Sequence, residues 1–231
     1  MRILATSDMH GDLSNIDLNG IDIACLAGDI APLKGFGPWH VYDQVKWMRT
    51  RFKKWCESWP STDIIFIPGN HDFFPLAESR FKVELAKQDL SLSLAPNAHM
   101  ILDECIDVKG VRIYGSPWIP VISYRWAFEA EHDILVEKFR KIPENVDILL
   151  THAPPRLNYV DVSLEHGIFS EKFGSHELAD AIVAKTPKIC ICGHIHSGDH
   201  NKNILHETEV HNVSRVNESY AVAYEPLVFE K

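Results

Sequence analysis

Histidines in one short stretch stand where an apolar run ends, at a spacing that could bring both to a metal ion. Residues 188–198 read KICICGHIHSG, so His194 and His196 follow Gly193 on either side of Ile195. In an extended segment, residues two apart point to the same side, so both imidazoles can reach one point in space. One such pair is weak support for a site, and its meaning depends on the rest of the chain.

Four other apolar runs end in residues of the same kind. They are followed by Asp8 and His10 in DMH, Asp29 in GD, Asn70, His71 and Asp72 in GNHD, and His152 in TH. Imidazole, carboxylate and amide groups without a thiolate favour Mn, Fe, Co, Ni or Zn over a soft-metal site. In open α/β sheets the binding crevice lies at the carboxyl ends of the strands. We therefore predict one metal site, built from five strand ends.

The elements that must position these residues follow from the apolar pattern. The runs are continuous, as in strands that are covered on both faces, at 2–8, 21–29, 63–70, 146–152 and 188–194. Helical patterns lie between them, at about 40–58, 75–90, 127–140 and 174–186. A tight turn is predicted at Lys109-Gly110 between two antiparallel strands, and two or three more strands in 203–230. We expect a single domain over residues 1–231, with a mixed β core and helices outside.

Composition narrows the class of function. The net charge of the 231 residues is -9, which argues against a large nucleic-acid footprint. No apolar run approaches the roughly 18–20 residues of a membrane span, and the first residues do not resemble a secretory signal. The five cysteines lie mostly in apolar surroundings and are expected to be reduced thiols. We therefore expect a cytoplasmic protein without membrane contact.

The ordered set of motifs between residues 8 and 196 resembles the calcineurin-like metallophosphoesterase superfamily, in the order D-x-H, GD, GNHD, H and GHxH. A narrower likeness is carried by YGSPWIP and WAF within 114–128, THAPP at 151–155 and HNVS at 211–214. These segments resemble metallophosphoesterase-domain proteins of the class III cyclic-nucleotide phosphodiesterase type. The resemblance implies an α/β fold, a four-layer αββα sandwich of mixed sheets with outer helices.

The resemblance also implies roles for the motif residues. It assigns the first metal ion to Asp8, His10, Asp29 and His196, and the second to Asp29, Asn70, His152 and His194. Asp29 would bridge the two ions, and His71 would face the substrate instead of binding metal. The cofactors would be two divalent ions, with Mn as the first candidate and Fe, Zn, Ni or Co as alternatives.

The chemistry of phosphoester hydrolysis fits this division. Two metal ions about 3.5–4 Å apart can deprotonate a bridging water near neutral pH and clamp the phosphate, so the bridging hydroxide attacks phosphorus. A bridge requires a carboxylate such as Asp29, because an imidazole offers one lone pair to one metal. His71 could act as general acid at the leaving oxygen, or stabilise charge there as imidazolium.

The substrate expected from this reading is a small phosphodiester, with cyclic nucleotides among the candidates. A phosphomonoesterase or protein phosphatase is an alternative, but such relatives pair the substrate-facing histidine with an aspartate that GDIAPLKG (28–35) lacks. A nuclease is disfavoured by the acidic balance. A non-catalytic scaffold of the same fold is disfavoured because His71 and every ligand position are intact. The sequence leaves the physiological substrate, the metal pair and the oligomeric state open.

Several residues near the motifs have two readings. Trp118 and His211 are candidate substrate contacts, while Trp126 and Phe128 either pack a loop or form an aromatic wall. Asp12 either orients His10 or caps a turn. Segment 31–60 is either a helix packed on the sandwich or a lid.

Overall fold

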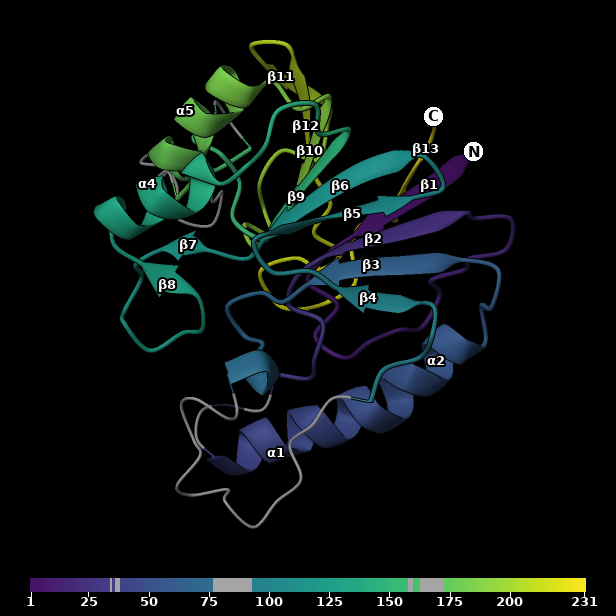
Figure 1. Cartoon of the computed structure of the whole chain (residues 1–231). Coiled ribbons are helices and arrows are strands. Elements are labelled where there is room, and N and C mark those ends of the chain that lie inside the picture. Colours follow the sequence, from purple (N-terminus) through teal and green to yellow (C-terminus); the bar gives the residue numbers. More distant parts are fainter. Residues whose placement is uncertain (34, 36–37, 77–92, 158–159, 163–172) are drawn as a thin grey trace.

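Two β-sheets form the middle of the molecule in this computed structural model, which describes residues 1–33, 35, 38–76, 93–157, 160–162 and 173–231 (Figure 1). The first sheet has the order β13-β1-β2-β3-β4. Its strands are β1 (Arg2–Thr6), β2 (Ile23–Ala27), β3 (Asp63–Ile67), β4 (Ala98–Met100) and β13 (Leu227–Glu230). Strands β1 to β4 are parallel, and β13 runs antiparallel to β1.

The second sheet has the order β11-β12-β10-β9-β6-β5. Its strands are β5 (Glu104–Val108), β6 (Val111–Ser116), β9 (Ile148–Thr151), β10 (Ile189–Cys192), β11 (Asn203–Leu205) and β12 (Thr208–Asn212). The four central strands are parallel and the two edge strands are antiparallel. A further pair, β7 (Ile119–Pro120) and β8 (Glu129–Ala130), stands apart from both sheets.

Helices cover the outer faces of the two sheets. The first sheet is covered by α1 (Pro38–Trp47), the π-helical turn η1 (Met48–Phe52) and α2 (Lys53–Glu57), and the second by α4 (His132–Arg140) and α5 (His176–Lys185) (Figure 1). A 3-10 turn, η2 (Phe74–Leu76), follows β3. Among the described residues, no helix combines the length and hydropathy needed to cross a membrane.

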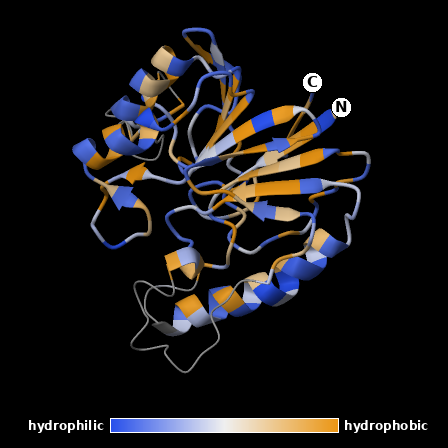
Figure 2. Ribbon diagram, in the orientation of Figure 1, coloured by the Kyte–Doolittle hydropathy of each residue, from blue (hydrophilic) through white to orange (hydrophobic). Residues whose placement is uncertain are grey.

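Three apolar clusters lie between these four layers. Under α1 and α2 pack Leu4, Leu26, Phe66, Val41, Val45 and Phe52. Between the sheets pack Ile3, Cys25, Ile65, Ile113, Leu150 and Ile191. Under α4 and α5 pack Leu149, Cys190, Val210, Leu135, Phe139 and Ile182. Neighbouring strand residues therefore enter different clusters, and Figure 2 shows the strands as mostly hydrophobic. The predicted αββα sandwich is confirmed.

Some predicted boundaries need correction. The helix predicted over 127–140 begins only at His132, because the preceding residues form β8 and a loop. The Glu129 carboxylate holds that loop by accepting the backbone N–H groups of Ile122, Ser123 and Trp126, at 2.6, 2.7 and 2.8 Å. The helix predicted over 40–58 spans 38–57 and is interrupted by the π turn. Most of the helix predicted at 75–90 lies outside the described residues.

The hairpin predicted at Lys109-Gly110 is present. Both residues have positive φ, 49° and 78°, and β5 pairs with β6 up to Val108 and Val111. A two-residue turn with positive φ at both positions suits the twist of the strands it joins. None of the five cysteines forms a disulfide bond in the structure.

Candidate metal centre

The predicted ligands meet where the carboxyl ends of the two sheets come together. Backbone contacts join the sheets at this edge, since Ser7 N–H donates to the carbonyl of Val213 at 2.9 Å. A side-chain contact does the same, with His152 Nδ1 2.8 Å from the carbonyl oxygen of Ala27. Residues that follow β1, β2 and β3 therefore face residues that follow β9 and β10.

Sharp backbone turns aim the ligands inward. Asp8, Asp29 and His194 have φ of 54°, 51° and 70°, a left-handed conformation that few non-glycine residues adopt. Gly28, with φ 97°, precedes Asp29, and a Cβ there would collide with the ring of His152. Strained backbone of this kind persists where surrounding structure holds it, and it clusters at functional sites.

Asp29 lies at the centre of the cluster. Its Oδ1 accepts the backbone N–H of His71 at 2.8 Å, while Oδ2 faces three imidazoles. The Oδ2 atom lies 3.4 Å from Nε2 of His152 and 3.9 Å from Nε2 of both His10 and His71. Burial favours the protonated acid, but the positive charge of His152 is the main reason that the pKa of Asp29 lies well below its ordinary value. Asp29 is therefore an anion at the position expected of a bridging ligand.

Asp8 is fixed by hydrogen bonds that are made mainly to one of its two oxygens. Ser7 Oγ donates to Oδ2 at 2.7 Å, the backbone N–H of His194 donates at 3.0 Å, and Ser214 Oγ also donates to it. The other oxygen, Oδ1, lies 3.5 Å from His196 Nε2. Burial opposes ionisation, but the hydrogen bond and charge of His196 lower the pKa of Asp8. Oδ1 receives only a longer contact from the His194 N–H, at 3.3 Å, and it can face a cation beside His196.

The other side of the cluster contains Asn70, His152 and His194. Asn70 Oδ1 lies 2.8 Å from His152 Nε2, and the ring centres of His152 and His194 are 5.0 Å apart. Donation of Nδ1–H to a backbone carbonyl leaves Nε2 of a neutral imidazole with its lone pair free, which is how metal-binding histidines are commonly oriented. A cation beside Asn70 Oδ1 and His152 Nε2 would satisfy both atoms.

The donor set fits metal ions on two counts. Both ring nitrogens of His10 are buried without a hydrogen-bond partner, which is costly unless a further group binds there. Three sets of ligand atoms each lie within 4.8 Å of one another: Asp8, His10 and His196; His10, Asp29 and His71; Asp8, Asp29 and His152. The sets share Asp8, His10 and Asp29, so they form one centre. His194 lies outside these sets and is placed by its ring contact with His152.

Aromatic rings flank the centre, one of them not anticipated from the sequence. The ring centre of Trp126 lies 4.2 Å from that of His71. Tyr220 lies 4.9 Å from His10 and 5.1 Å from His196, and 46% of it is exposed. The loop that carries Glu218 and Tyr220, called here the Tyr220 loop, is anchored to residues 193–197 (GHIHS). Ser197 N–H and Oγ donate to the Glu218 carboxylate at 3.0 and 2.5 Å. Since Tyr220 lies in a loop, no periodic pattern marks it.

Three predicted residues are not brought to the cluster. Trp118 Nε1 donates to Asp103 at 2.9 Å, and Lys138 Nζ lies 4.0 Å from the centre of its ring. His211 lies 3.5 Å from the Glu209 carboxylate and lines a separate cavity of about 390 Å³ beside the C-terminal segment. Asp12 accepts the backbone N–H and hydroxyl of Ser14 at 2.8 and 2.5 Å, the turn-capping alternative.

Known proteins resemble the chain in sequence and in fold. It is 32% identical over 215 residues to metallophosphoesterase domain-containing protein 1 of Homo sapiens, a match that covers 85% of this chain and 61% of that protein. A UPF0046 protein of Caenorhabditis elegans is 30% identical over 188 residues, covering 72% of this chain and 46% of that protein. The chain thus spans less than two thirds of the length of these curated relatives.

Solved structures share the fold at low sequence identity. TT1561 of Thermus thermophilus has a TM-score of 0.59 and 18% identity, covering 91% of this chain and 88% of that one. Phosphopantetheinyl hydrolase from Mycobacterium tuberculosis has a TM-score of 0.53 and 14% identity, covering 94% and 90%. A family model described as calcineurin-like phosphoesterase matches residues 1–198, which include every residue of the cluster. The chain therefore belongs to the calcineurin-like phosphoesterase family.

Proposed function

We propose that this chain is a phosphodiesterase that hydrolyses small phosphodiesters with two divalent metal ions, with cyclic nucleotides among the candidate substrates. The observation that carries the proposal is the position of Asp29 Oδ2, which faces imidazoles from both sheets within 3.9 Å. Two bound ions, with Mn²⁺ as first candidate, would supply a water of lowered pKa and positive charge for the phosphoryl oxygens. The protein supplies fixed ligands and a place for the ester beside them.

His71 is the residue we assign to the leaving-group side. Its backbone N–H is held by Asp29, and its Nδ1 is buried without a hydrogen-bond partner. Burial is the main reason that the pKa of His71 is lowered, so the neutral ring is favoured at neutral pH. A neutral imidazole can donate one hydrogen bond to an ester oxygen.

The surroundings of His71 favour a diester over a monoester. In the described part of the chain, Asp29 is the one carboxylate within 4.0 Å of His71, so no separate aspartate is positioned to keep His71 protonated. The phosphatase alternative expects a separate aspartate beside this histidine, so the lack of one among these residues favours the diester. The rings of Trp126 and Tyr220 offer faces on which a planar group of the diester can stack.

The proposal is tested by a substrate panel on protein reconstituted with Mn²⁺, comparing an aryl phosphodiester, cyclic nucleotides and an aryl phosphomonoester. We expect the highest kcat/KM for a diester. Measurable metal binding with no diester hydrolysis would contradict the proposal. Faster cleavage of the monoester would favour the phosphatase alternative.

Two substitutions separate binding of metal from action on the ester. We expect His71→Ala to lower kcat for the diester by about 10²–10⁴-fold while metal content stays normal. Asp29→Asn removes the central charge and should lower metal content itself. Metal analysis and kinetics on both variants check this, and identical behaviour of the two variants would refute the division of roles.

A further inference from the structure

A recess adjoins the metal centre on the side of α1 and η1. It has a volume of about 490 Å³, and its lining includes His10, Pro32, Lys46, Thr50 and Arg51. His10 also belongs to the metal cluster, so the recess borders the metal centre. Small-molecule sites commonly have volumes of about 300–1,000 Å³, so the recess can take part of a ligand.

The π-helical turn explains why two cationic side chains line the same recess. Lys46 and Arg51 are five residues apart, and in an α-helix of 3.6 residues per turn such residues point about 140° away from each other. Here the backbone N–H of Lys53 donates to the carbonyl of Met48, five residues earlier. That wider turn begins two residues after Lys46, so it narrows the angle between Lys46 and Arg51, which both line the recess. Such turns occur frequently at functional sites.

The charge of the recess suits an anion. Lys46 and Arg51 are exposed, and no carboxylate of the described residues lies within 4.0 Å of either side chain. Asp43 also lines the recess, so two cations stand against one carboxylate. The whole protein has a net charge of -9, so a recess with more cations than carboxylates stands out from the rest of the chain. Binding of an anion would account for this local excess of positive charge.

Hydrogen bonds from α1 fix the position of the recess relative to the metal centre. Gln44, on the same helix and buried, donates from Nε2 to the carbonyl of His71 at 2.8 Å and accepts the backbone N–H of Phe73 at 2.8 Å. These two bonds fix α1 to the loop that carries Asn70 and His71. Segment 31–60 therefore does more than cover the sheet. Gln44 of α1 holds the loop that carries His71, and Lys46 of the same helix lines the recess.

We propose that the recess binds a second phosphate group, carried by the same molecule whose phosphodiester lies at the metal centre. This inference rests on the proposed function and narrows its substrate class to phosphodiesters that carry a separate phosphate. Lys46 and Arg51 are the residues that bind this second group. A diester without it lacks these contacts and binds only through the metal centre and the flanking aromatic rings.

The test compares two ligands that differ only in the second phosphate. Adenosine 5'-monophosphate, adenosine 3',5'-bisphosphate and inorganic phosphate are titrated calorimetrically into the full chain with saturating Mn²⁺. We expect the bisphosphate to bind about tenfold more tightly than the monophosphate, with an advantage that shrinks as salt is added. In the double variant Lys46→Gln/Arg51→Gln, the bisphosphate and the monophosphate should bind with about equal affinity. Thr50→Glu, which places a carboxylate in the recess, should have the same effect.

The matched control is Lys54→Gln, which removes one positive charge from the exposed surface of α2 outside the recess and should keep the advantage. An equal affinity for the two nucleotides in the unmodified protein would overturn the inference, as would an advantage that survives the double substitution. If only inorganic phosphate responds to that substitution, the recess binds a free anion and the inference also fails. Because binding is measured without turnover, an intact advantage without diester hydrolysis overturns the proposed function alone.

Discussion

Single residues of the centre hold protons that a metal ion must displace. Burial favours the neutral ring of His152, but the charge of Asp29 outweighs it and raises the pKa of His152 to about 9. In the metal-free protein this gives a stabilisation that is complete below the ordinary pKa of 6.5 and is lost as the pH rises through about 9. Metal affinity depends on pH in the opposite direction and rises with pH, because the cation binds only the neutral imidazole ring.

We therefore expect the apparent affinity for the Mn²⁺ ion that His152 binds to rise about tenfold per pH unit between pH 7 and 9, because binding of that ion releases the His152 proton. Calorimetric titrations at three pH values check the affinity, and titrations in buffers of different ionisation enthalpy check the proton release. An affinity independent of pH over this range would contradict the raised pKa of His152.

A second prediction concerns Ser214, whose hydroxyl donates to Asp8 Oδ2. In Ser214→Ala the carboxylate loses one of the donors that fix its orientation. Loss of such an orienting contact typically weakens metal affinity by about 10–100-fold. Metal titration of this variant should show the loss, while Ser219→Ala, in an exposed position of the Tyr220 loop, should bind metal normally. Equal affinities in the two variants would mean that Ser214 has no such role.

Residue types and strand ends were enough to predict which side chains gather at the centre. Asp8, Asp29 and His152 each follow a buried parallel strand, and parallel strands place their ends at one edge. Tyr220 could not be found in this way, because its loop is positioned by Ser197 and Glu218, which are 21 residues apart. Contacts of that kind have no local sequence signal.

At the scale of elements, α1 is joined to the His71 loop through Gln44. In Gln44→Leu, the His71 carbonyl and the Phe73 N–H lose their partner in a buried place, because leucine can neither donate nor accept. We expect the free energy of unfolding to fall by about 2–4 kcal/mol. Urea denaturation measures this, with Lys54→Ala as an exposed control that should change stability by less than about 0.5 kcal/mol. A similar small loss in Gln44→Leu would show that the two bonds contribute little.

Element boundaries were predicted less well than element types. The pattern 127–140 contains apolar residues at helical spacing, yet Glu129 accepts three backbone N–H groups and keeps its segment extended and looped. A side chain that competes for backbone donors overrides periodicity. The π turn at Met48–Phe52 likewise leaves no mark in composition, because it changes the spacing of side chains but not their types.

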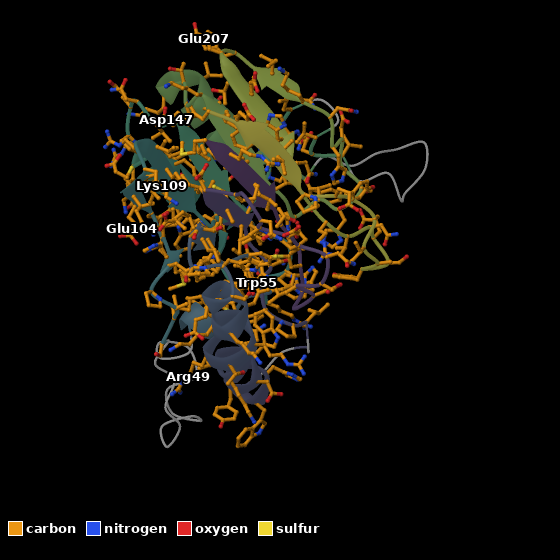
Figure 3. The ribbon with its side chains drawn as sticks, turned by 90° about the vertical axis from the view of Figure 1, so that its right-hand side faces the viewer. Arg49, Trp55, Glu104, Lys109, Asp147 and Glu207 are labelled. Atoms are coloured by element: carbon orange, nitrogen blue, oxygen red, sulfur yellow. The ribbon has the colours of Figure 1, made fainter. Side chains whose placement is uncertain are left out.

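At the scale of the molecule, the two sheets meet at both ends of their parallel strands. The carboxyl ends form the metal centre, and the amino ends are joined by charged side chains, among them Lys109 and Asp147, which Figure 3 labels. Asp147 accepts Arg112 N–H at 2.9 Å and lies 2.8 and 2.6 Å from Nζ of Lys188 and Lys231. A β core with helices outside was predictable because each buried strand must be covered on both faces, whereas the division into four layers was implied by the family resemblance. The polar contacts that join the layers could not be predicted, because their partners, such as Lys109 and Asp63, lie far apart in the sequence.

Lys109 should therefore contribute to stability but not to the centre. Its Nζ lies 2.9 Å from Asp63 Oδ2 and donates to the carbonyls of Asp22 and Ser61 at 2.8 and 3.1 Å, which joins the β5–β6 hairpin to the first sheet. Solvent screens the partly exposed ion pair, so we expect Lys109→Met to lower the unfolding free energy by about 1 kcal/mol and Tm by about 2–4 °C. Thermal denaturation and Mn²⁺ titration check both points. Lys202→Met, whose pair with Glu209 is exposed on both sides, should change Tm less, and weakened metal binding in Lys109→Met would show that the two ends are coupled.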